Sequence, residues 1–439
     1  MGRIVCKFGG TSVADHNQFR QVKSIVESDP RRLIIVPSAP GKRHKEDPKV
    51  TDLLYLCHDT ALQNVDFTPV FNQIRDRFIE IERELGIKAG MAAAFEQFKA
   101  QIKAGVSRDF MGSRGEYFNG LLMAAYLGAE FVDPEQFVII TPMGVVDPVS
   151  YDLLGKRLAD ERKKYVIPGF YGRDHYGQVK TFSRGGSDIS GSIAARAARA
   201  ELYENWTDVS GLLMADPRIV ANPTDMDQIT YREIRELSYM GASVFHDEAI
   251  LPVREARIPI NIKNTNKPND PGTFIVPEFT HSKYKVAGIA GKKNFTMITV
   301  EKTLMNREIG FGYKVLGVLF SQGISFEHAP TSIDSMSIIL DEKQLADRNK
   351  EELVVAEITR TVGPDSIVVS RDLALIAVVG EEFTTTVGLH AIGLDALRNA
   401  GINVHLINMG ASELNMIIGV RNADYEQAVR VLYEAYVKA

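Results

Sequence analysis

Short apolar runs alternate with longer amphipathic segments over the part of the chain that precedes Lys292. The short runs are apolar on both faces, which predicts buried strands at residues 2–6, 33–37, 137–141, 165–168, 178–181, 202–206 and 259–263. Between them, apolar residues recur with a helical period, for example at 18–27, 72–84 and 117–127. This alternation predicts an α/β domain with a mostly parallel sheet sandwiched by helices. Ligands of such folds lie at the carboxyl ends of the strands, where the glycine-rich turns of this sequence fall.

A different pattern follows Lys292 and occurs twice. The two copies are VLGVLFSQGISFEHAPTSIDSMSIIL and AIGLDALRNAGINVHLINMGASELNMIIGV, with Gly323 and Gly401 standing 78 positions apart. At the same offset Ile324 matches Ile402, and each copy is typical of a helix, a glycine, a strand, a loop and a strand. We therefore predict tandem copies of a small αβ-sandwich module with a regulatory role.

Length, charge and cysteine content narrow the class of protein. A chain of 439 residues is too long for one ordinary core. The net charge of -5 argues against a nucleic-acid footprint, and Cys6 and Cys57 are too few for a disulfide framework. No apolar run approaches the ~20 residues that a membrane span needs, and no secretory signal is recognisable. We expect a cytoplasmic globular protein with neither nucleic acid nor membrane as a partner.

The segment KFGGTSVAD follows the first predicted strand. Its glycine pair, Gly9 and Gly10, lets the backbone approach an anion closely because no Cβ intrudes. Thr11 or Ser12 can cap the following helix, whose N–H groups favour phosphate. Lys7 can neutralise a transferring phosphoryl group, although the Walker A pattern is absent. The alternative is a tight turn with a solvated lysine.

A second glycine pair occurs in TFSRGGSDISGS, after a strand expected at 179–182. Ser187 and Asp188 can cap a helix of small residues at 189–200. Arg184 can grip a carboxylate through two hydrogen bonds, and Asp188 can orient Lys7 or capture a proton. The simpler alternative is a capped helix with a surface arginine, but two such turns in one domain favour a site.

Three further segments are rich in polar groups. In NWTDVSGLLMADPRIV, a long loop follows the strand that ends at Trp206; it either holds a nucleoside or lies on the surface. In SRGEYFNG, we expect Glu116 in the first turn of an apolar helix, where the dipole favours an acid and a substrate ammonium is a natural partner. In PSAPGKRHKEDPKVTDLL, a basic loop precedes a helix starting near Thr51; it is either solvated or a lid over phosphates.

Together these segments resemble the aspartokinases of the amino acid kinase family over essentially the whole chain. KFGGTSVAD is similar to their nucleotide and phosphoryl-transfer signature, and SRGGSD resembles G-R-G-G-S-D with Ser183 in place of the usual glycine. TDVSGLLMADPRIV resembles the nucleotide loop T-D-V-x-G-x-Y-T-x-D-P-R, SRGE the motif S-x-G-E, and GASVFHDEAI the motif G-A-K-V-L-H-P-x-A-[IL]. The C-terminal duplication resembles tandem ACT modules, and we expect no further catalytic domain after Ala439.

The resemblance implies a domain organisation and a reaction. An amino acid kinase domain of the carbamate-kinase type would occupy residues 1–292, with ACT modules at 293–370 and 371–439. The reaction would transfer the γ-phosphoryl group of ATP to the side-chain carboxylate of L-aspartate, giving 4-phospho-L-aspartate, in the first step of lysine, threonine and methionine biosynthesis. Since the sequence offers no all-protein metal cage, Mg²⁺ would be carried by the ATP phosphates.

The same resemblance assigns roles by position. The implied catalytic residues are Lys7, Arg184 and Asp188. The residues implied to bind aspartate are Ser38, Thr51, Glu116, Arg184 and Ser187, with Glu116 on the ammonium and Arg184 on a carboxylate. The residues implied to bind the nucleotide are Lys7, Gly9, Gly10, Thr207, Asp208 and Arg218.

Three positions depart from the family pattern. Ser243 stands where a nucleotide-phosphate lysine is usual, Leu213 where a tyrosine packs near the adenine, and Asp247 where the proline of L-H-P stands. The loss of a positive charge at Ser243 matters most. The candidate replacement cations are Lys42, Lys45 and Lys263.

The first C-terminal copy contains ISFEHAPTSIDSMSI, which resembles the effector region of members that respond to lysine or threonine. Ser332, Asp334 and Ser335 would hold the effector, and His328 is either a ligand or a structural histidine. We expect allosteric inhibition by lysine, threonine or both. Exposed sheet edges of the ACT modules favour a homodimer, with a tetramer as the alternative.

Two other functions stay open at this point. One is a related kinase of the same fold that acts on glutamate, acetylglutamate or a nucleotide, which the tandem modules and SRGE disfavour. The other is a non-catalytic amino-acid sensor, for which the loss of the lysine at Ser243 is the motivating feature.

Overall fold

The computed structural model describes residues 2–183, 185–241, 247–278, 283–345, 348–409 and 412–438, without the side chains of residues 247, 248 and 348. The chain forms two compact units. The first contains residues 1–212, 225–238 and 243–281, and the second contains 213–224, 239–242 and 282–439.

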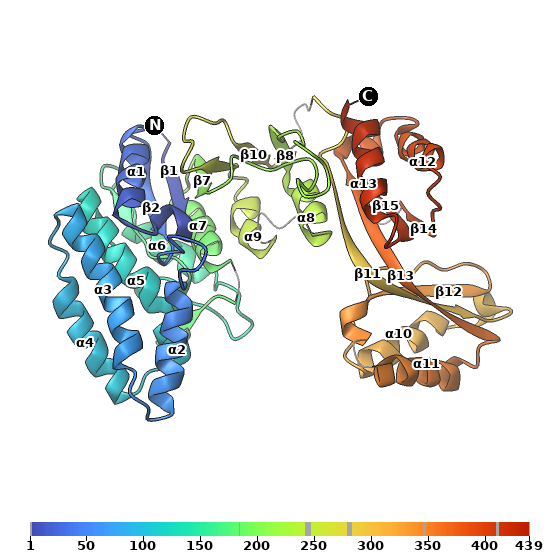
Figure 1. The fold of residues 1–439 in the computed structure, drawn as a ribbon, viewed down its shortest axis with the longest axis horizontal. Helices are drawn as coiled ribbons and strands as arrows, with labels where there is room; N and C mark the ends of the chain where they lie inside the picture. The colour runs from blue at the N-terminus through green and yellow to red at the C-terminus, as the bar shows by residue number, and fades with distance from the viewer. Residues whose placement is uncertain are drawn as a thin grey trace. The chain divides into compact units, whose positions relative to one another are not determined.

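An eight-stranded sheet organises the first unit (Figure 1). In spatial order its strands are β3 (Glu130–Phe131), β4 (Tyr165–Val166), β2 (Arg32–Pro37), β1 (Ile4–Phe8), β7 (Leu202–Thr207), β9 (Ile260–Asn264), β10 (Thr273–Val276) and β8 (Gln228–Thr230). All pairings are parallel except that of β9 with β10. This confirms the predicted mostly parallel sheet.

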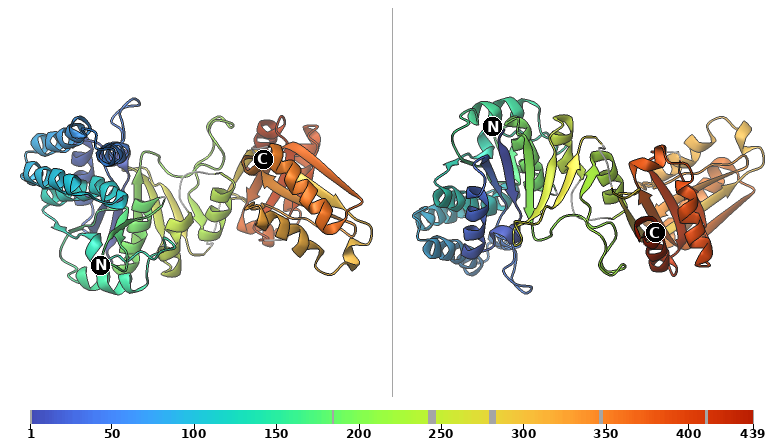
Figure 2. Two further views of the ribbon diagram at one scale, coloured as in Figure 1. Left: turned by 90° about the horizontal axis from the view of Figure 1, so that it is seen from below. Right: turned by 90° about the horizontal axis from the view of Figure 1, so that it is seen from above.

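Helices cover both faces of this sheet, and Figure 2 shows the strands between the two helical layers. The helices are α1 (His16–Glu27), α2 (Val50–Leu62), α3 (Thr68–Leu85), α4 (Met91–Ala104), α5 (Arg108–Leu127), α6 (Val149–Arg157), α7 (Gly186–Ala197), α8 (Tyr231–Tyr239) and α9 (Asp247–Glu255). Because side chains alternate along a strand, Cys6 and Phe8 of β1 face the cluster built with α1, α3 and α5. Lys7 points to the other face, where α7 packs against β1 and β7.

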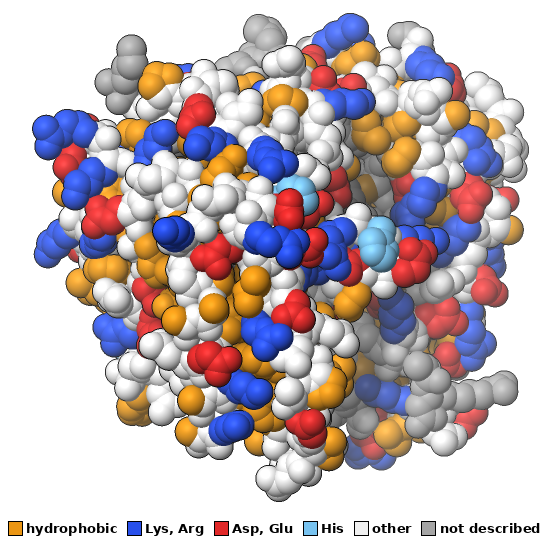
Figure 3. All heavy atoms as spheres, turned by 60° about the vertical axis from the view of Figure 1, so that its left-hand side comes forward, with side chains coloured by type: hydrophobic (Ala, Val, Ile, Leu, Met, Phe, Trp, Pro, Cys, Tyr) orange, Lys and Arg blue, Asp and Glu red, His pale blue; other side chains and the backbone are white. Residues whose placement is uncertain are grey.

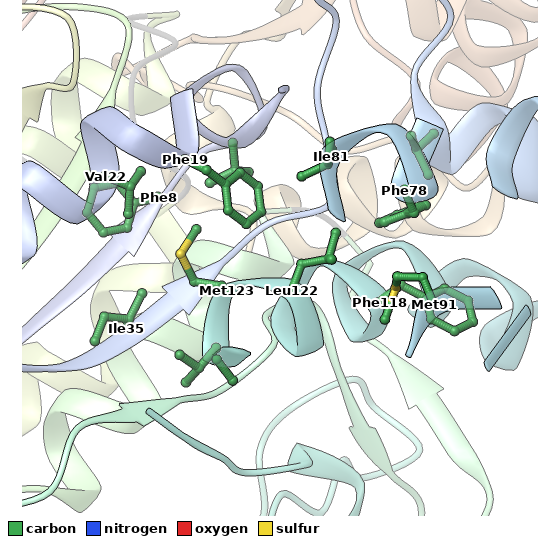
Figure 4. Packing of buried hydrophobic residues seen from close by; sticks show 14 of the residues in the cluster. Phe8, Phe19, Val22, Ile35, Phe78, Ile81, Met91, Phe118, Leu122 and Met123 are labelled. Carbon is green, nitrogen blue, oxygen red and sulfur yellow. The ribbon is translucent and has the colours of Figure 1, made fainter. Parts of the chain in front are cut away.

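The core between the sheet and α1, α3, α4 and α5 is rich in aromatic residues. Figure 4 shows Phe8 of β1 near Phe19 and Val22 of α1, and Phe118 of α5 close to Phe78 of α3. The rings of Phe95 and Phe118 stack with their centroids 4.3 Å apart. Each fully buried apolar side chain stabilises the fold by ~1.5–3 kcal/mol, so this cluster holds the strand ends of β1 and β2 in place.

Several element boundaries differ from the sequence-based prediction. The helix expected at 117–127 begins at Arg108, so Glu116 lies in the middle of α5 and the prediction of a first-turn acid is wrong. The segment 137–141 forms isolated bridges at Ile139 and Ile140 rather than a strand. The segment expected at 178–181 is β6 (Val179–Thr181), which pairs with β5 (Tyr171–Arg173) in a separate antiparallel ribbon.

The second unit is built on a five-stranded sheet of order β12-β11-β13-β15-β14. Its elements are β11 (Gly288–Glu301), α10 (Phe311–Ser321), β12 (Ser335–Asp341), α11 (Arg348–Val362), β13 (Ser366–Val379), α12 (Leu389–Asn399), β14 (Leu406–Asn408), β15 (Asn415–Arg421) and α13 (Tyr425–Tyr433). In Figure 1 the long strands β11 and β13 run side by side through this unit.

The 78-residue repeat holds for whole elements of this unit. Strands β11 and β13, and helices α10 and α12, have bounds that differ by 78 positions. Gly323 and Gly401 both end their helices with positive φ, +64° and +69°. The two long strands pair with each other, with Gly288 opposite Val379 and Glu301 opposite Ser366, which relates the copies by an approximate two-fold axis.

The copies differ in one strand. After Gly401 the second copy has β14, as predicted. Between Gly323 and Ser335, where every residue is described, the first copy has isolated bridges, His328 to Ile339 and Thr331 to Met336. The prediction of two strands in each copy is therefore wrong for the first copy.

Side chains of both charge signs are intermingled on the face shown in Figure 3. Within the described part of the chain, no helix is both long and apolar enough to cross a bilayer.

Candidate active site

Three polar side chains meet at the carboxyl end of β1. The Lys7 ammonium lies 2.6 Å from Asp188 Oδ1 and donates to Asn205 Oδ1 at 3.3 Å. The Asn205 amide in turn donates to Asp188 Oδ1 at 3.0 Å. Lys7 is only 7% exposed, so its charge is held close to the protein and depends on these two acceptors.

Strand register brings these residues together. Lys7 of β1 stands directly opposite Asn205 of β7 in the parallel pairing. Asp188 lies in the first turn of α7, which packs on the same face of the sheet. The Tyr203 hydroxyl donates to the backbone carbonyl of Asp188 at 3.2 Å, so β7 holds this residue at two points.

The first glycine pair follows β1 directly. Gly9 N donates to Trp206 O at 2.9 Å, and a Cβ at Gly9 would lie 3.7 Å from Lys7 Nζ. A Cβ at Gly10 would lie 3.1 Å from Ala39 O. A Cβ would therefore make only ordinary contacts at Gly9, next to the lysine, whereas the backbone at Gly10 is tightly packed.

The hydroxyls after this glycine pair do not cap α1, which corrects the sequence-based prediction. Asp15 caps α1 by accepting from Asn17 N and Gln18 N. Residues 10–13 form a short 3-10 helix first, so the hydroxyls stand too early to reach the N-terminus of α1. Ser12 instead bonds Thr265 through the hydroxyls, 2.7 Å apart.

The loop after β7 reaches the first glycine turn. Thr11 Oγ1 donates to Asp208 Oδ2 at 3.3 Å, and Thr207 Oγ1 donates to Asp208 Oδ1 at 3.3 Å. Thr207, Asp208 and the Gly9–Gly10 turn thus form one continuous polar edge beside Lys7.

The second glycine turn precedes α7. Gly185 has φ +57° and lies at the N-cap of α7, so the N-cap residue itself has no side chain with which to cap the helix. Ser187 and Asp188 were expected as caps; Asp188 bonds Lys7 and Asn205 instead, while Ser187 packs against Gly169, where a Cβ would lie 2.7 Å from its Oγ. Arg184 lies outside the described residues.

Glu116 is buried on α5, and no hydrogen-bond partner among the described residues reaches its Oε2. Burial raises the pKa of this carboxyl to about 8, against the opposing effect of the Ala39 backbone hydrogen bond. The neighbouring Gly115 lies against Ala39 and Val50, which adjoin Ser38 and Thr51 in the sequence. Asn119, one turn along α5, donates to Ser38 O at 2.7 Å.

The basic loop between β2 and α2 is anchored at both ends. Gly41 N donates to Gly10 O at 2.8 Å, and the Gly41 carbonyl accepts from the Arg77 guanidinium. Arg77, buried on α3, also pairs with Asp47 at 3.3 Å. Hydrogen bonds from Arg43 hold the pKa of Asp47 well below its usual range.

Other predicted residues fall elsewhere. Arg218 belongs to the second unit, where its exposed guanidinium pairs with Asp216 at 2.6 Å. Ser243 and the side chain of Asp247 lie outside the described residues. Of the candidate cations, Lys42 donates to Lys45 O at 3.1 Å, and Lys263 lies 5.4 Å from the Trp206 ring centroid. Lys263 pairs with Trp206 in register, on the sheet face opposite Lys7.

The expected effector residues lie in the second unit. Asp334 accepts from Leu304 N at 2.8 Å and thereby holds the turn after β11, while Ser332 N donates to Ser335 O at 2.7 Å. The His328 ring lies 3.1 Å from the Asn408 amide, which ties the first copy to β14 of the second.

No cluster of three or more His, Cys, Asp or Glu side chains within the described ranges is arranged as a metal site. Two carboxylates lie beside the first glycine turn. Asp188 pairs with the Lys7 ammonium, and Asp208 accepts a hydrogen bond from the Thr11 hydroxyl. Carboxylate oxygens are ligands that Mg²⁺ favours when it also binds phosphates, so these groups fit a phosphate-borne metal.

Sequence reasoning missed three residues of this region: Asn205, Gly41 and Arg77. Asn205 follows Glu204 inside a buried strand, and two polar residues at such positions are a signal that could have drawn attention to it. Gly41 and Arg77 act through backbone contacts that no local pattern encodes.

The comparisons with known proteins agree with this geometry. The profile of the amino acid kinase family matches residues 2–264, and an ACT domain profile matches residues 376–436. The chain is 40% identical to aspartokinase 3 of Bacillus subtilis, over 98% of each chain.

Solved structures show the same likeness. The crystal structure of aspartate kinase from Clostridium acetobutylicum matches with a TM-score of 0.91 and 46% identity, covering 99% of this chain and 100% of that one. Escherichia coli aspartokinase III, crystallised with aspartate and ADP, matches with a TM-score of 0.74 and 25% identity over 99% of both chains. The same protein crystallised with lysine and aspartate gives a TM-score of 0.76 and 26% identity, again over 99% of both.

A mostly parallel sheet with a lysine and a carboxylate beside a glycine turn, in a chain that also contains an ACT-type unit, defines an α/β enzyme of the amino acid kinase class. Within that class, the chain belongs to the aspartokinase family.

Proposed function

We propose that this enzyme transfers the γ-phosphoryl group of ATP to the side-chain carboxylate of L-aspartate, giving 4-phospho-L-aspartate and ADP. The observation that carries the proposal is the buried Lys7 ammonium, held by Asp188 and Asn205 beside the backbone of Gly9, which has no side chain. Support also comes from Escherichia coli aspartokinase III, which crystallised with aspartate and ADP.

The proposed reaction needs positive charge near the transferring phosphoryl group more than it needs a general base. A carboxylate is already a nucleophile, so the barrier lies in bringing two anions together and in the charge of the transferring group. Lys7 supplies a fixed positive charge at the turn, and the Gly9–Gly10 backbone permits close approach of phosphate oxygens. Thr207 and Asp208 extend the same edge toward the rest of the nucleotide. The proposed nucleotide role of Arg218 rests on the resemblance alone.

Mg²⁺ bound to the ATP phosphates would supply additional counter-charge. Asp188 and Asp208 are the residues of this chain that would hold it or its waters, since both carboxylates flank the turn.

The proposed aspartate site lies around α5. Glu116 would pair with the substrate ammonium, whose arrival supplies the partner that Oε2 lacks among the described residues. Ser38 and Thr51 belong to segments that adjoin Gly115, and Ser187 belongs to the first turn of α7. Arg184 is proposed to hold a carboxylate, by the resemblance alone.

The test is ADP release measured in a coupled assay with aspartate, glutamate or acetylglutamate as acceptor. We expect turnover with aspartate, and loss of ~10³-fold or more in kcat on Lys7→Ala because a transition-state charge is left unpaired. The matched control is Lys23→Ala, which removes a surface lysine packed on Tyr126. Turnover with another acceptor would favour a related kinase, and aspartate binding without turnover would favour a sensor.

We further propose that lysine, threonine or both inhibit the enzyme through the second unit, with Ser332, Asp334 and Ser335 near the effector. The lysine complex of Escherichia coli aspartokinase III supports this proposal. The proposed assembly is a homodimer through ACT modules at 293–370 and 371–439, with a tetramer as the alternative. Titration of each amino acid against the kinase rate tests the regulation; no response to either up to ~10 mM would reject it, given couplings of ~1–3 kcal/mol.

A further inference from the structure

We propose that Asn205 is a positioning residue of the phosphoryl-transfer site: its amide fixes both the Lys7 ammonium and the Asp188 carboxylate, and so aims the remaining lysine N–H at the transferring phosphoryl group. This inference rests on the proposed function. The juxtaposition that carries it is the triangle formed by Lys7 Nζ, Asn205 Oδ1 and Asp188 Oδ1.

The triangle can orient the Lys7 ammonium because that group has a fixed number of N–H donors. An ammonium has three N–H donors in a tetrahedral arrangement and no acceptor. Asp188 Oδ1 takes one donor at 2.6 Å and Asn205 Oδ1 takes a second at 3.3 Å. Two donors held by fixed acceptors determine the direction of the third, because the second acceptor further restrains rotation of the ammonium about its Cε–Nζ bond. The backbone of Gly9, with no side chain, adjoins this ammonium.

Asn205 also holds the Asp188 carboxylate, which is the acceptor in the ion pair with Lys7. Its amide donates to the same Asp188 oxygen that binds Lys7, so the carboxylate is held from β7 as well as from β1. The Tyr203 hydroxyl, two residues earlier on β7, holds the backbone carbonyl of Asp188. A side chain with both an acceptor and a donor is needed between an ammonium and a carboxylate, and an amide provides this without adding charge.

The groups around Asn205 determine how a carboxyl group placed at this position would ionise. Its amide contacts Lys7 from β1 and Asp188 from α7, and the Asp188 backbone carbonyl accepts from the Tyr203 hydroxyl of β7. On the other side, β9 presents Ile262 in register. A carboxyl group in place of the amide would therefore share its site with Asp188, and two carboxyl groups at this distance resist ionising together.

The test uses the full chain with Asn205→Asp and Asn205→Leu. In Asn205→Asp, a protonated carboxyl group imitates the amide at low pH. We expect kcat to be higher at pH 6 than at pH 8 and to fall about tenfold per pH unit where this proton is lost. In Asn205→Leu we expect kcat to fall by ~10²-fold, the effect of a small misplacement, with the KM for aspartate unchanged.

The control is Asn261→Asp, the same substitution at a buried asparagine of β9 on the opposite sheet face, in register with Glu204. We expect it to keep the wild-type pH profile of kcat. Wild-type kcat in Asn205→Leu, or a wild-type pH profile in Asn205→Asp, would overturn the positioning role while leaving the proposed function intact.

A second readout does not depend on turnover. Acetic anhydride labelling, followed by peptide mass spectrometry, measures the reactivity of Lys7 against Lys23 in the same sample. We expect Lys7 to be labelled several-fold faster in Asn205→Leu than in the wild type, because an acceptor that stabilises the ammonium is gone. Equal labelling would overturn the inference even if aspartate proved not to be the substrate, and absence of wild-type turnover would reject only the proposed function.

Discussion

The Gly41 N–H donates to the carbonyl of Gly10 at 2.8 Å, so the loop after β2 closes directly onto the glycine turn after β1. A Cβ at Gly41 would lie 2.6 Å from Thr11 N and 2.7 Å from Gly10 O. Real Cβ atoms do not approach backbone that closely, so the contact requires glycine.

We predict that Gly41→Ala displaces the glycine turn and lowers kcat/KM by ~10²-fold, because small misplacements of a phosphate-binding backbone are costly. Steady-state kinetics with ATP varied would measure this. Gly312→Ala in α10, where a Cβ meets open space, is the matched control and should leave kcat/KM unchanged. Normal kinetics of Gly41→Ala would show that the two loops do not act together.

The buried Glu116 should make stability depend on pH. Since burial raises the pKa of its carboxyl to about 8, the folded state retains a proton that the unfolded state releases. Stability from this group is therefore present at acidic pH and is lost as the pH rises toward about 8.

We predict that Glu116→Gln raises the melting temperature, relative to the wild type, more at pH 9 than at pH 5.5. The variant should also raise the KM for aspartate, since the proposed partner of the substrate ammonium is gone. Thermal melts at the two pH values, with the exposed Glu96→Gln as the charge control, would check the first effect. An equal gain at both pH values would contradict it.

The buried Arg77 should hold the basic loop in place. Removing one partner of a buried ion pair costs ~3–5 kcal/mol, and Arg77→Met would leave Asp47 and the Gly41 carbonyl without this cation. We predict faster trypsin cleavage after Lys42, Arg43 or Lys45. Arg75→Met, on the exposed side of the same helix, should leave the cleavage rate as it is in the wild type. Protection of the loop in Arg77→Met would refute the anchor.

The repeat predicts that equivalent substitutions in the two copies lower the free energy of unfolding by similar amounts. Gly323 and Gly401 have positive φ, and a Cβ added at either residue would meet open space, so alanine adds backbone strain alone. We expect Gly323→Ala and Gly401→Ala each to destabilise by ~1–2 kcal/mol, and the double variant by the sum. Urea unfolding would measure these values. A large loss of unfolding free energy at one site and none at the other would argue that the two turns are not equivalent.

The alternation of elements and the duplicated segment were predictable because both depend on local periodicity. The strands β1, β2, β7 and β9 lie within two residues of their expected bounds. The 78-residue offset read from Gly323 and Gly401 extends to β11 and β13. Buried strands and helix-ending glycines leave a local trace in sequence, so they could be found without a structure.

The start of α5 and the role of Asn205 could not be predicted for physical reasons. The segment around Gly112 and Gly115 is typical of a loop, yet both glycines lie in α5. Each faces a neighbour that leaves no space for a Cβ, Tyr55 for Gly112 and Ala39 for Gly115. Tertiary packing thus overrides a poor helix propensity. Asn205 meets Lys7 across 198 positions, through a strand register that is set only when the sheet forms.

The pairing of β11 with β13 has a consequence for how the second unit can vary. Residues 295–301 of β11 pair with β12, and residues 373–379 of β13 pair with β15, while β11 and β13 also pair with each other. Each long strand therefore belongs to its own repeat and contacts the other one. A substitution in either strand therefore changes the packing of both copies of the repeat. One copy cannot be altered, removed or exchanged with that of a relative without changing the surroundings of the other.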